Sequence, residues 1–591
     1  MSTYTLYNSD FSAGEVSPVF LGRSDLERYD KGLELCRNAI PNPLGCVYKR
    51  HGTKYLATLP SSTTAALAAF DAGTHGRFVV EFTNLLIRFW TDSGTLVQYN
   101  SADFSIVSAY ASSELSTIRT TMNKGIMYIV HGNHKPATIR LGSASEAPFV
   151  LEECTFTGGR LFNASGDYPT CQCFKGGRWY LAGTDNEPNA IFASRTPDAT
   201  TGDRFTDFTF SELDSSGGTV VLSSHAIYLQ ESDMYGSRIK WLINGQRVLA
   251  GAGKSIWMSD GSIPTPSTFD MDITLQGGCS SIPPLALDNY IVYADFGGNH
   301  ICIMSYSEDS DGYTKSIISS TAGNMLLDGI KTMALMQGKQ SMIWIVTENG
   351  NLVSCSFDPS SGSNGWAMHQ LGGTGAKAET LIILPGDEDN ADSLWIVVNR
   401  SGILTVEKID AESPEERGFG NYLDSSVTLT FDTPTNTIAI PRFEGLSVSA
   451  VADDAVLPDK TLDATGTAIY DRSFSSITVG FKYTMMLRTV RREIPANGSS
   501  QMNRKNIQEA TLRLYQSLGG KVGKSLDDMI PILPIVAGSY VFNTAPQLVT
   551  GDRKISISSS TDEESRLYIT SDDPMPLCLL AVMIRFGIKE A

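Results

Sequence analysis

Two histidines and two cysteines have the residue types and close spacing that could hold a metal ion. His131 and His134 stand three residues apart in HGNH, and Cys171 and Cys173 form a C-x-C pair. Zinc takes such ligands, but the histidines lie between an expected strand and Pro136, where we expect a turn rather than a helix that would bring both rings to one face. No second cysteine pair follows at zinc-finger spacing. We therefore predict no metal site.

The segment GAGKS, residues 251–255, resembles the end of a phosphate-binding loop. The full spacing fails because Val248 occupies the position of the first glycine, and SIWMSDGS continues as strand and turn instead of helix. We expect a hairpin here. No nucleophile elbow or H-E-x-x-H signature occurs, although scattered carboxylates of the glycosidase kind remain possible among 64 acidic residues. We predict no catalytic or cofactor-binding residue, and no enzyme.

Composition describes a large, folded and acidic protein. The 591 residues are 41% hydrophobic and 9% aromatic, which favours two to four folded domains over disorder. The formal net charge of -18 repels nucleic-acid backbones, so a sequence-reading DNA binder is disfavoured, whereas a conduit through which DNA slides is not. The nine scattered cysteines suit reduced thiols better than a disulfide framework.

Targeting signals are missing from the printed sequence. The opening MSTYTLYNSDFSAGE has neither a basic region nor an apolar core of a signal peptide. No run approaches the roughly 18–20 apolar residues that span a bilayer. We expect synthesis and folding in a cytoplasm, unless a larger assembly carries the chain out.

Short apolar runs recur between residues 78 and 400, mostly about 50 residues apart. They are FVVEF at Phe78, IMYIV at Ile126, RWYLA at Arg178, RVLAG at Arg247, YIVYA at Tyr290, MIWIV at Met342 and LWIVV at Leu394. Most are followed by a turn and a second strand, which predicts a repeated β-meander too small to bury its own face. Stacked radially, such units form a β-propeller of about six or seven blades, and a β-sandwich is the alternative. The long gap between the third and fourth runs leaves room for an insertion.

Three segments follow from this pattern. Residues 1–60 form an N-terminal arm with one helix, residues 61–420 a propeller-like domain, and residues 421–591 a C-terminal β-rich module. The N-terminal segment has too few apolar residues to stand alone. We therefore expect a mainly β fold in which the N-terminal segment packs on another part of the assembly.

The helix of this arm is expected over 22–38. Apolar residues recur there at three- and four-residue intervals: Leu26, Tyr29, Leu33, Cys36 and Ile40. Ser24 and Glu27 have the spacing of a capping box. Gly32 weakens the interior, so the helix must pack on its own chain or on a neighbouring one.

The opening FSAGEVSPVFLGRSDLERYDKGLELCRN contains an F-x-x-G-E-x-S-P start, a G-R-x-D-L-x-R-Y segment and a C-R-N step. In these motifs it resembles a known family, the tail nozzle proteins (tail tubular protein B) of short-tailed bacteriophages. The resemblance implies that the N- and C-terminal parts build a platform or nozzle module beside the propeller, and that the N-terminal helix is a platform helix. Further blocks in the same order, including RWYLAGTDNEPNAIFASRTPD and ATLRLYQSLGGKVG, extend the resemblance over nearly the whole chain. One departure is His51, where relatives often carry a proline before the glycine. In the segment 11–57, which we call the N-terminal block, the matching residues are Phe11, Gly14, Glu15, Ser17, Pro18, Gly22, Arg23, Asp25, Leu26, Arg28, Tyr29, Cys36, Arg37, Asn38, Pro43, Gly45, Arg50, Gly52 and Thr53.

The resemblance implies a structural virion protein located in the phage tail. It implies a homohexamer that forms the distal tail tube below an adaptor ring, carries fibres or tailspikes at its side, meets the host surface indirectly and lets DNA pass without sequence-specific binding. Its candidate platform or subunit-interface residues are Glu15, Arg23, Asp25, Arg28, Tyr29, Arg37 and Asn38. The sequence leaves open whether their charges pair within one subunit or between subunits. The alternative function is a β-propeller enzyme or binding module that acts on host surface polysaccharide.

Overall fold

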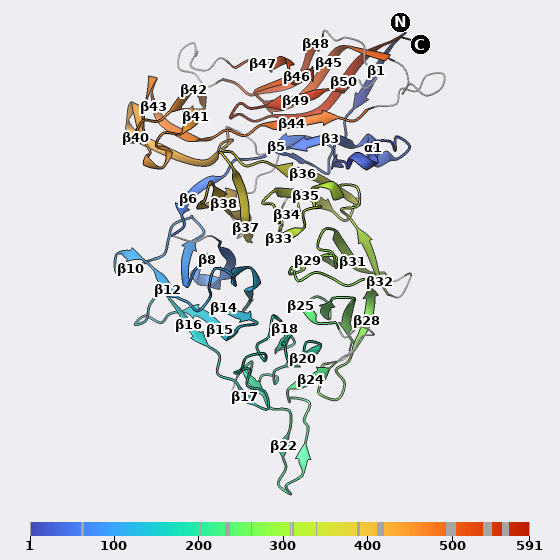
Figure 1. The fold of residues 1–591 in the computed structure, drawn as a ribbon, viewed down its shortest axis with the longest axis vertical. Helices are drawn as coiled ribbons and strands as arrows, with labels where there is room; N and C mark the ends of the chain where they lie inside the picture. Colours follow the sequence, from blue (N-terminus) through green and yellow to red (C-terminus); the bar gives the residue numbers. More distant parts are fainter. Residues whose placement is uncertain are drawn as a thin grey trace. The chain divides into compact units, whose positions relative to one another are not determined.

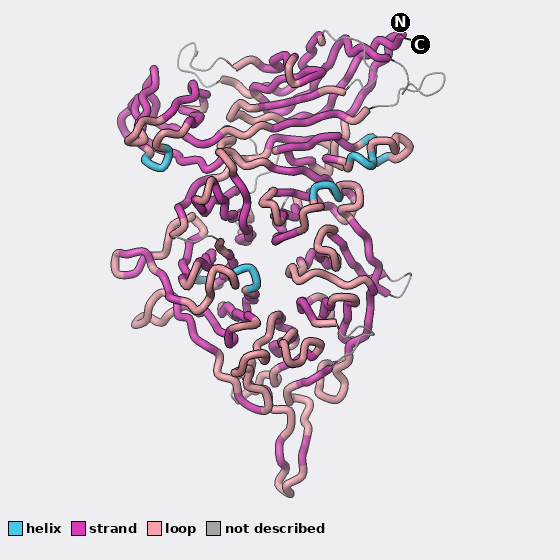
Figure 2. The backbone as a smooth tube through the Cα atoms, viewed as in Figure 1, coloured by secondary structure: helices cyan, strands magenta, loops and turns pink. Residues whose placement is uncertain are grey.

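The computed structural model describes most of the chain and is dominated by strands (Figures 1 and 2). The described residues are 2–60, 64–200, 202–230, 237–261, 263–307, 309, 312–338, 340–386, 391–410, 419–491, 504–535, 546–557 and 566–589. The chain divides into two compact units. Unit 1 comprises residues 1–58, 321–325 and 334–591, and unit 2 comprises residues 59–320 and 326–333.

Unit 2 contains five four-stranded sheets that follow one another along the chain. Figure 1 shows them in an arc, coloured from blue to green. The first has β7 (Ala66–Asp71), β8 (Arg77–Thr83), β9 (Leu86–Thr91) and β12 (Ser105–Val107). The second has β13 (Arg119–Asn123), β14 (Ile126–His131), β15 (His134–Leu141) and β16 (Phe149–Glu153). The third has β18 (Cys171–Lys175), β19 (Arg178–Ala182), β20 (Ala190–Ala193) and β24 (Ile227–Gln230). The fourth has β25 (Ile239–Asn244), β26 (Val248–Ala252), β27 (Ser255–Ser259) and β28 (Met271–Gln276), and the fifth has β29 (Leu285–Leu287), β30 (Tyr290–Ala294), β31 (Ile301–Ser307) and β32 (Gly312–Ile317).

Unit 1 contains two further sheets of the same kind. One has β33 (Ile330–Met336), whose residues divide between the units, with β34 (Met342–Thr347), β35 (Leu352–Asp358) and β36 (Ser363–His369). The other has β37 (Ala376–Leu384), β38 (Ser393–Arg400), β39 (Ile403–Asp410) and β6 (Lys54–Thr58). Strand β6 precedes the first sheet in the sequence and pairs with β39 of the last one.

The hydrophobic cores lie between successive sheets, as the propeller prediction requires. Phe89 of the first sheet and Met127 of the second belong to one buried cluster. A second cluster joins Tyr128 to Trp179 of the third sheet, and later clusters continue in the same way. A strand covered on both faces must be apolar throughout, and all six residues of β34 are buried. The fold class is confirmed: the described part of the chain is a mainly β protein with the seven four-stranded sheets of a β-propeller.

The insertion expected after the third run lies between β20 and β24. It contains β21 (Asp207–Phe208), which pairs with β17 (Thr157–Gly158), and a hairpin of β22 (Glu212–Leu213) and β23 (Thr219–Val220). A separate two-stranded pair, β10 (Gln98–Tyr99) and β11 (Ala102–Asp103), lies in the connection between β9 and β12 of the first sheet.

Helices are limited to short turns in the described residues: α1 (Glu27–Asp30) and the 3-10 turns η1 (Pro18–Phe20), η2 (Gly73–His75), η3 (Leu115–Thr117), η4 (Gly323–Met325) and η6 (Pro441–Phe443). None of these has the length and apolar run that a membrane crossing requires.

The rest of unit 1 interleaves the two ends of the chain. One sheet has β1 (Ser2–Asn8), β4 (Ala39–Pro41), β5 (Val47–Lys49), β45 (Arg504–Ser517), β48 (Val549–Ser556) and β50 (Cys578–Lys589). A second, continuous with β36, has β2 (Gly14–Glu15), β3 (Gly32–Arg37), β44 (Met485–Thr489), β46 (Gly519–Ser525), β47 (Asp528–Leu533) and β49 (Tyr568–Ser571). A third region, continuous with β6, has β40 (Asp424–Ala439), β41 (Ser447–Ala452), β42 (Ala455–Thr461) and β43 (Thr467–Phe481). The first two share one apolar core.

The helix predicted over 22–38 is wrong. Only the single turn α1 is helical, its N-cap is Leu26, and no side chain caps it, so the proposed capping box of Ser24 and Glu27 does not form. The segment instead becomes β3, which pairs with β2 and with β44. A register shift between Leu33 and Leu35 lets Leu33 and Cys36 both face the core. The bulge therefore produces the three-residue spacing that resembled a helical period.

The other local predictions can be compared directly with the strands. Each of the seven apolar runs is the second strand of one sheet, namely β8, β14, β19, β26, β30, β34 and β38. Residues 251–255 lie at the turn between β26 and β27, which pair antiparallel, so the hairpin is confirmed. The segment boundaries at residues 60 and 420 remain predictions.

Candidate functional site

Three of the seven predicted platform residues, Arg28, Tyr29 and Asn38, bond to distant parts of unit 1, whereas Glu15 and Arg37 pair with each other inside the N-terminal block. The buried Glu15 carboxylate accepts bonds from the Cys36 amide at 2.9 Å and from Arg37 at 2.8 Å. Burial raises the pKa of Glu15, against the opposing charge of Arg37. Arg28 donates to the Asn364 carbonyl at 2.6 Å, which fixes α1 to β36.

Tyr29 and Asn38 make similar links to the C-terminal module. The buried Tyr29 hydroxyl donates to the Arg491 carbonyl at 2.6 Å. Asn38 has a φ of 51° and donates to the Thr484 carbonyl at 2.8 Å. These two side chains therefore bond within the same chain.

Arg23 and Asp25 differ from the other five. Their side chains pair with each other through two bonds of 2.8 Å, and 56% and 62% of their surfaces are exposed. Within the predicted set they are the two residues that a second chain could reach directly.

A buried ion pair between Arg50 and Asp424, which the sequence did not indicate, lies in the same unit. The guanidinium donates to the carboxylate at 2.8 and 2.6 Å, and both side chains are almost fully buried. The remaining guanidinium hydrogens reach Asn38, the His51 carbonyl and the Gln370 carbonyl. This one side chain therefore links the N-terminal block, the end of β36 and the start of β40.

The carboxylate of Asp424 is equally well satisfied. It also accepts from the amides of Thr53 at 3.1 Å and Gly372 at 2.7 Å. Burial alone would raise the pKa of Asp424, but Arg50 and these hydrogen bonds outweigh it and lower the pKa. Arg50 also stacks on the ring of Tyr483, with its guanidinium carbon 3.8 Å from the ring centre.

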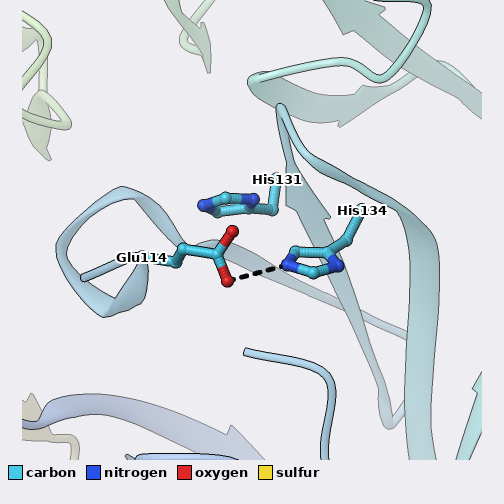
Figure 3. Close-up of side chains that lie close together, drawn as sticks. All are labelled: Glu114, His131 and His134. Atoms are coloured by element: carbon cyan, nitrogen blue, oxygen red, sulfur yellow. Dashed lines mark hydrogen bonds and ion pairs between the residues drawn. The ribbon is translucent and has the colours of Figure 1, made fainter. Parts of the chain in front are cut away.

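Unit 2 contains the one group of potential metal ligands found among the described residues: Glu114, His131 and His134 (Figure 3). One ligand atom from each residue lies within 4.8 Å of the other two. His131 ends β14 and His134 begins β15, and the two are direct cross-strand partners of the hairpin. Our argument that only a helix could bring them to one face is wrong, because a two-residue turn also does so.

The three side chains are already ordered by hydrogen bonds. His134 Nε2 lies 2.9 Å from a Glu114 oxygen, and the Ala111 amide donates to the same carboxylate at 3.0 Å. Bonds from Asn133 and His134 lower the pKa of Glu114 to about 2, so the group is ionised at neutral pH. His131 lies 2.7 Å from the Thr117 hydroxyl, and burial lowers the pKa of His131.

The C-x-C pair is structural. Cys171 and Cys173 lie in β18, and both side chains face the buried cluster between the third and fourth sheets. Burial raises the pKa of the Cys171 thiol to about 12, which disfavours the thiolate that a metal needs. All nine cysteines are free thiols.

Comparisons with known proteins yielded matches to solved structures alone, since no family model and no curated protein matches the sequence. One is Raptor of Chaetomium thermophilum, with 12% identity and a TM-score of 0.36, covering 62% of this chain and 29% of that one. Another is the β-propeller domain of Myceliophteria thermophila Cps50 (Swd1), with 10% identity and a TM-score of 0.36, covering 60% of this chain and 99% of that one. The chain thus spans less than a third of the Raptor chain. At these TM-scores the function has to be argued from the residues themselves.

Proposed function

We propose that this chain is a structural virion protein that forms the hexameric distal tail tube, or nozzle, of a short-tailed bacteriophage. In this role it retains packaged DNA, gates its ejection, and binds an adaptor ring and fibres or tailspikes. The observation that carries the proposal is the ordered match of the N-terminal block, residues 11–57, to the nozzle family.

Several of the matched residues make specific buried contacts in this chain, which supports treating the match as one motif. Arg50 makes the buried pair with Asp424. A Cβ on Gly14 would lie 2.2 Å from the Trp366 carbonyl oxygen, and a Cβ on Gly52 would lie 2.0 Å from that of Leu423. The block is therefore the segment around which the two ends of unit 1 assemble.

The same block also carries exposed apolar side chains. Val19 is 93% exposed and Leu44 is 86% exposed in the single chain. Single exposed apolar residues are common on monomers, but a ring of identical subunits must cover some of this surface. Together with the exposed Arg23–Asp25 pair, Val19 and Leu44 are our candidates for the subunit interface.

Imaging of the purified chain, alone and mixed with its candidate adaptor, tests the proposal. We expect sixfold rings, or rings that form when adaptor is added. Val19→Ser and Leu44→Ser should reduce the ring population, whereas Ile469→Ser, a control at a 61% exposed residue of unit 1 outside the block, should not. A chain that stays single with adaptor and releases reducing ends from host polysaccharide would instead support the propeller-enzyme alternative.

The mechanism that we propose is mechanical. Engagement of fibres at the host surface shifts the subunits, and the gate opens for DNA. The net charge of -18 motivates an acidic lumen that keeps DNA from adhering. If this is correct, lysine substitutions of luminal carboxylates will slow ejection; normal ejection by such variants would contradict the acidic lumen.

A further inference from the structure

The cluster of Glu114, His131 and His134 has the donor set of a transition-metal site. Two imidazoles and one carboxylate are the protein ligands of zinc in several enzymes, where a fourth position stays open to water. Zinc–ligand bonds of about 2.0–2.2 Å place the ligand atoms of a tetrahedral site about 3.4 Å apart. The present ligand atoms lie within 4.8 Å of one another, so small side-chain rotations suffice to bring them together.

The surroundings support the ligands from outside the cluster. The side-chain amide of Asn133 donates to Glu114 Oε1 at 3.0 Å, and the backbone amide of Ala111 donates to Glu114 Oε2 at 3.0 Å. The buried Tyr110 ring packs edge-on against His134, with the ring centres 5.1 Å apart. Such contacts orient ligands before the metal arrives.

The site is also reachable. The side chains of His134 and Glu114 are 24% and 18% exposed, while His131 is 3% exposed beneath them. Figure 3 shows the Glu114 carboxylate between the two rings. Glu114 and His134 are therefore the ligands in contact with solvent, and His131 is the buried one.

We propose that Glu114, His131 and His134 bind one divalent transition-metal ion, with zinc as the best fit. The ion displaces the Glu114–His134 hydrogen bond and a hydrogen bond of His131, whose Nδ1 accepts from the Asn133 backbone amide at 3.1 Å and whose Nε2 lies 2.7 Å from the Thr117 hydroxyl. Glu114 lies in the connection that follows the first sheet, and the histidines lie in the β14–β15 hairpin of the second. The bound metal thus ties the connection before β13 to the β14–β15 hairpin of the second sheet, a role that does not depend on the proposed nozzle function.

The test uses the full-length chain after chelator treatment and desalting. Zinc is titrated by calorimetry, and cobalt is titrated by visible absorption, which reports ligand type and geometry. We expect one equivalent of zinc to bind and to raise the thermal midpoint of unfolding. Glu114→Gln and His134→Gln should each weaken zinc binding at least tenfold and remove most of that shift. His75→Gln, at an exposed histidine of the same unit, is the matched control and should bind as the parent does.

Three results would overturn the proposal. They are the absence of saturable binding near one equivalent, unchanged binding by both Glu114→Gln and His134→Gln, and a cobalt spectrum with thiolate charge-transfer bands. Glu114→Gln keeps one of the two oxygens that accept from Ala111 and Asn133, and its side chain is 18% exposed to water, so it should fold even if His134→Gln does not. Far-ultraviolet circular dichroism of each metal-free variant verifies folding.

Discussion

One buried charge pair of unit 1 spans far more of the sequence than the buried pair of unit 2. In unit 1, Arg50 pairs with Asp424 across 374 residues of sequence. In unit 2, the buried Glu81 pairs with Arg88 only seven residues away, across the neighbouring strands β8 and β9. Long-range charge pairs define which distant segments meet, whereas the pair in unit 2 acts inside one sheet.

The apolar cores differ in the same sense. Those of unit 2 join one four-stranded sheet to the next, so every cluster consists of neighbours in the sequence. The largest shared core of unit 1 contains Phe11, Leu33, Met485 and Phe586, from both ends of the chain. Unit 2 is therefore held together by contacts between successive sheets, whereas this core of unit 1 forms only when the two ends of the chain pack together.

Asp424→Asn tests this comparison with the largest expected effect. The substitution leaves the buried Arg50 without a counter-charge, so we expect the free energy of unfolding to fall by about 3–5 kcal/mol. Denaturant unfolding followed by circular dichroism measures it. Glu81→Gln in unit 2 should cost less, because burial already raises the pKa of Glu81 and Arg88 is 12% exposed. Asp552→Asn, in an exposed pair with Arg513, is the control and should change little. Equal losses for Asp424→Asn and Asp552→Asn would refute the role given to the buried pair.

Gly14→Ala compared with Gly73→Ala separates crowding from backbone strain. Their φ angles are nearly equal, 63° and 62°, but a Cβ on Gly73 would meet nothing within 4 Å. We expect Gly73→Ala to cost about 1–2 kcal/mol from the left-handed backbone alone. Gly14→Ala should cost about 2 kcal/mol more, since the Trp366 backbone must move. Equal changes in denaturant midpoint would show that the β2–β36 contact is loose.

Lys49→Met tests whether a buried amine makes the stability of unit 1 rise with pH above about 7. Lys49 is fully buried, and its Nζ donates to the Asp573 carbonyl at 2.6 Å. Burial lowers the pKa of Lys49 from 10.5 to about 7. Between these values the unfolded chain binds the proton and the folded chain does not, so stability rises with pH.

From about pH 7.5 to about pH 9 this group should add about 2 kcal/mol to the free energy of unfolding. The parent and Lys49→Met are compared by denaturant unfolding at both pH values. The variant should lack this part of the pH dependence. Identical slopes for the two proteins would mean that Lys49 keeps its proton in the folded state.

Ser24→Ala should have the smallest effect. The N-cap of α1 is Leu26 and no side chain caps the turn, so we expect a change below about 0.5 kcal/mol. A loss of about 1 kcal/mol in thermal or denaturant unfolding would indicate a capping role for Ser24 after all.

The sequence predicted best those strands whose formation depends on residues close by in the chain. Each apolar run, such as MIWIV at Met342, became a strand because β-branched and aromatic residues filled a position covered on both faces. The segment around Leu33 and Cys36 was misread because its partner strand β44 lies more than 400 residues away and a bulge altered its period. A single sequence contains no signal for such a pairing.

The sites show the same limit. Arg50 was visible as a matched residue of the N-terminal block, but nothing in the sequence pointed to Asp424 as its partner. The pair His131 and His134 was visible too, and the turn expected there was correct. The sequence did not indicate that Glu114, from a connection outside the hairpin, lies beside the two histidines.

The mass of the full-length protein in solution, with and without its adaptor, tests the central claim most directly. Light scattering of the purified chain gives this mass without assumptions about shape. The nozzle proposal predicts a particle of six times 64.0 kDa, either alone or as the contribution of this chain to a complex with the adaptor. A particle of 64.0 kDa that persists when adaptor is present would contradict it.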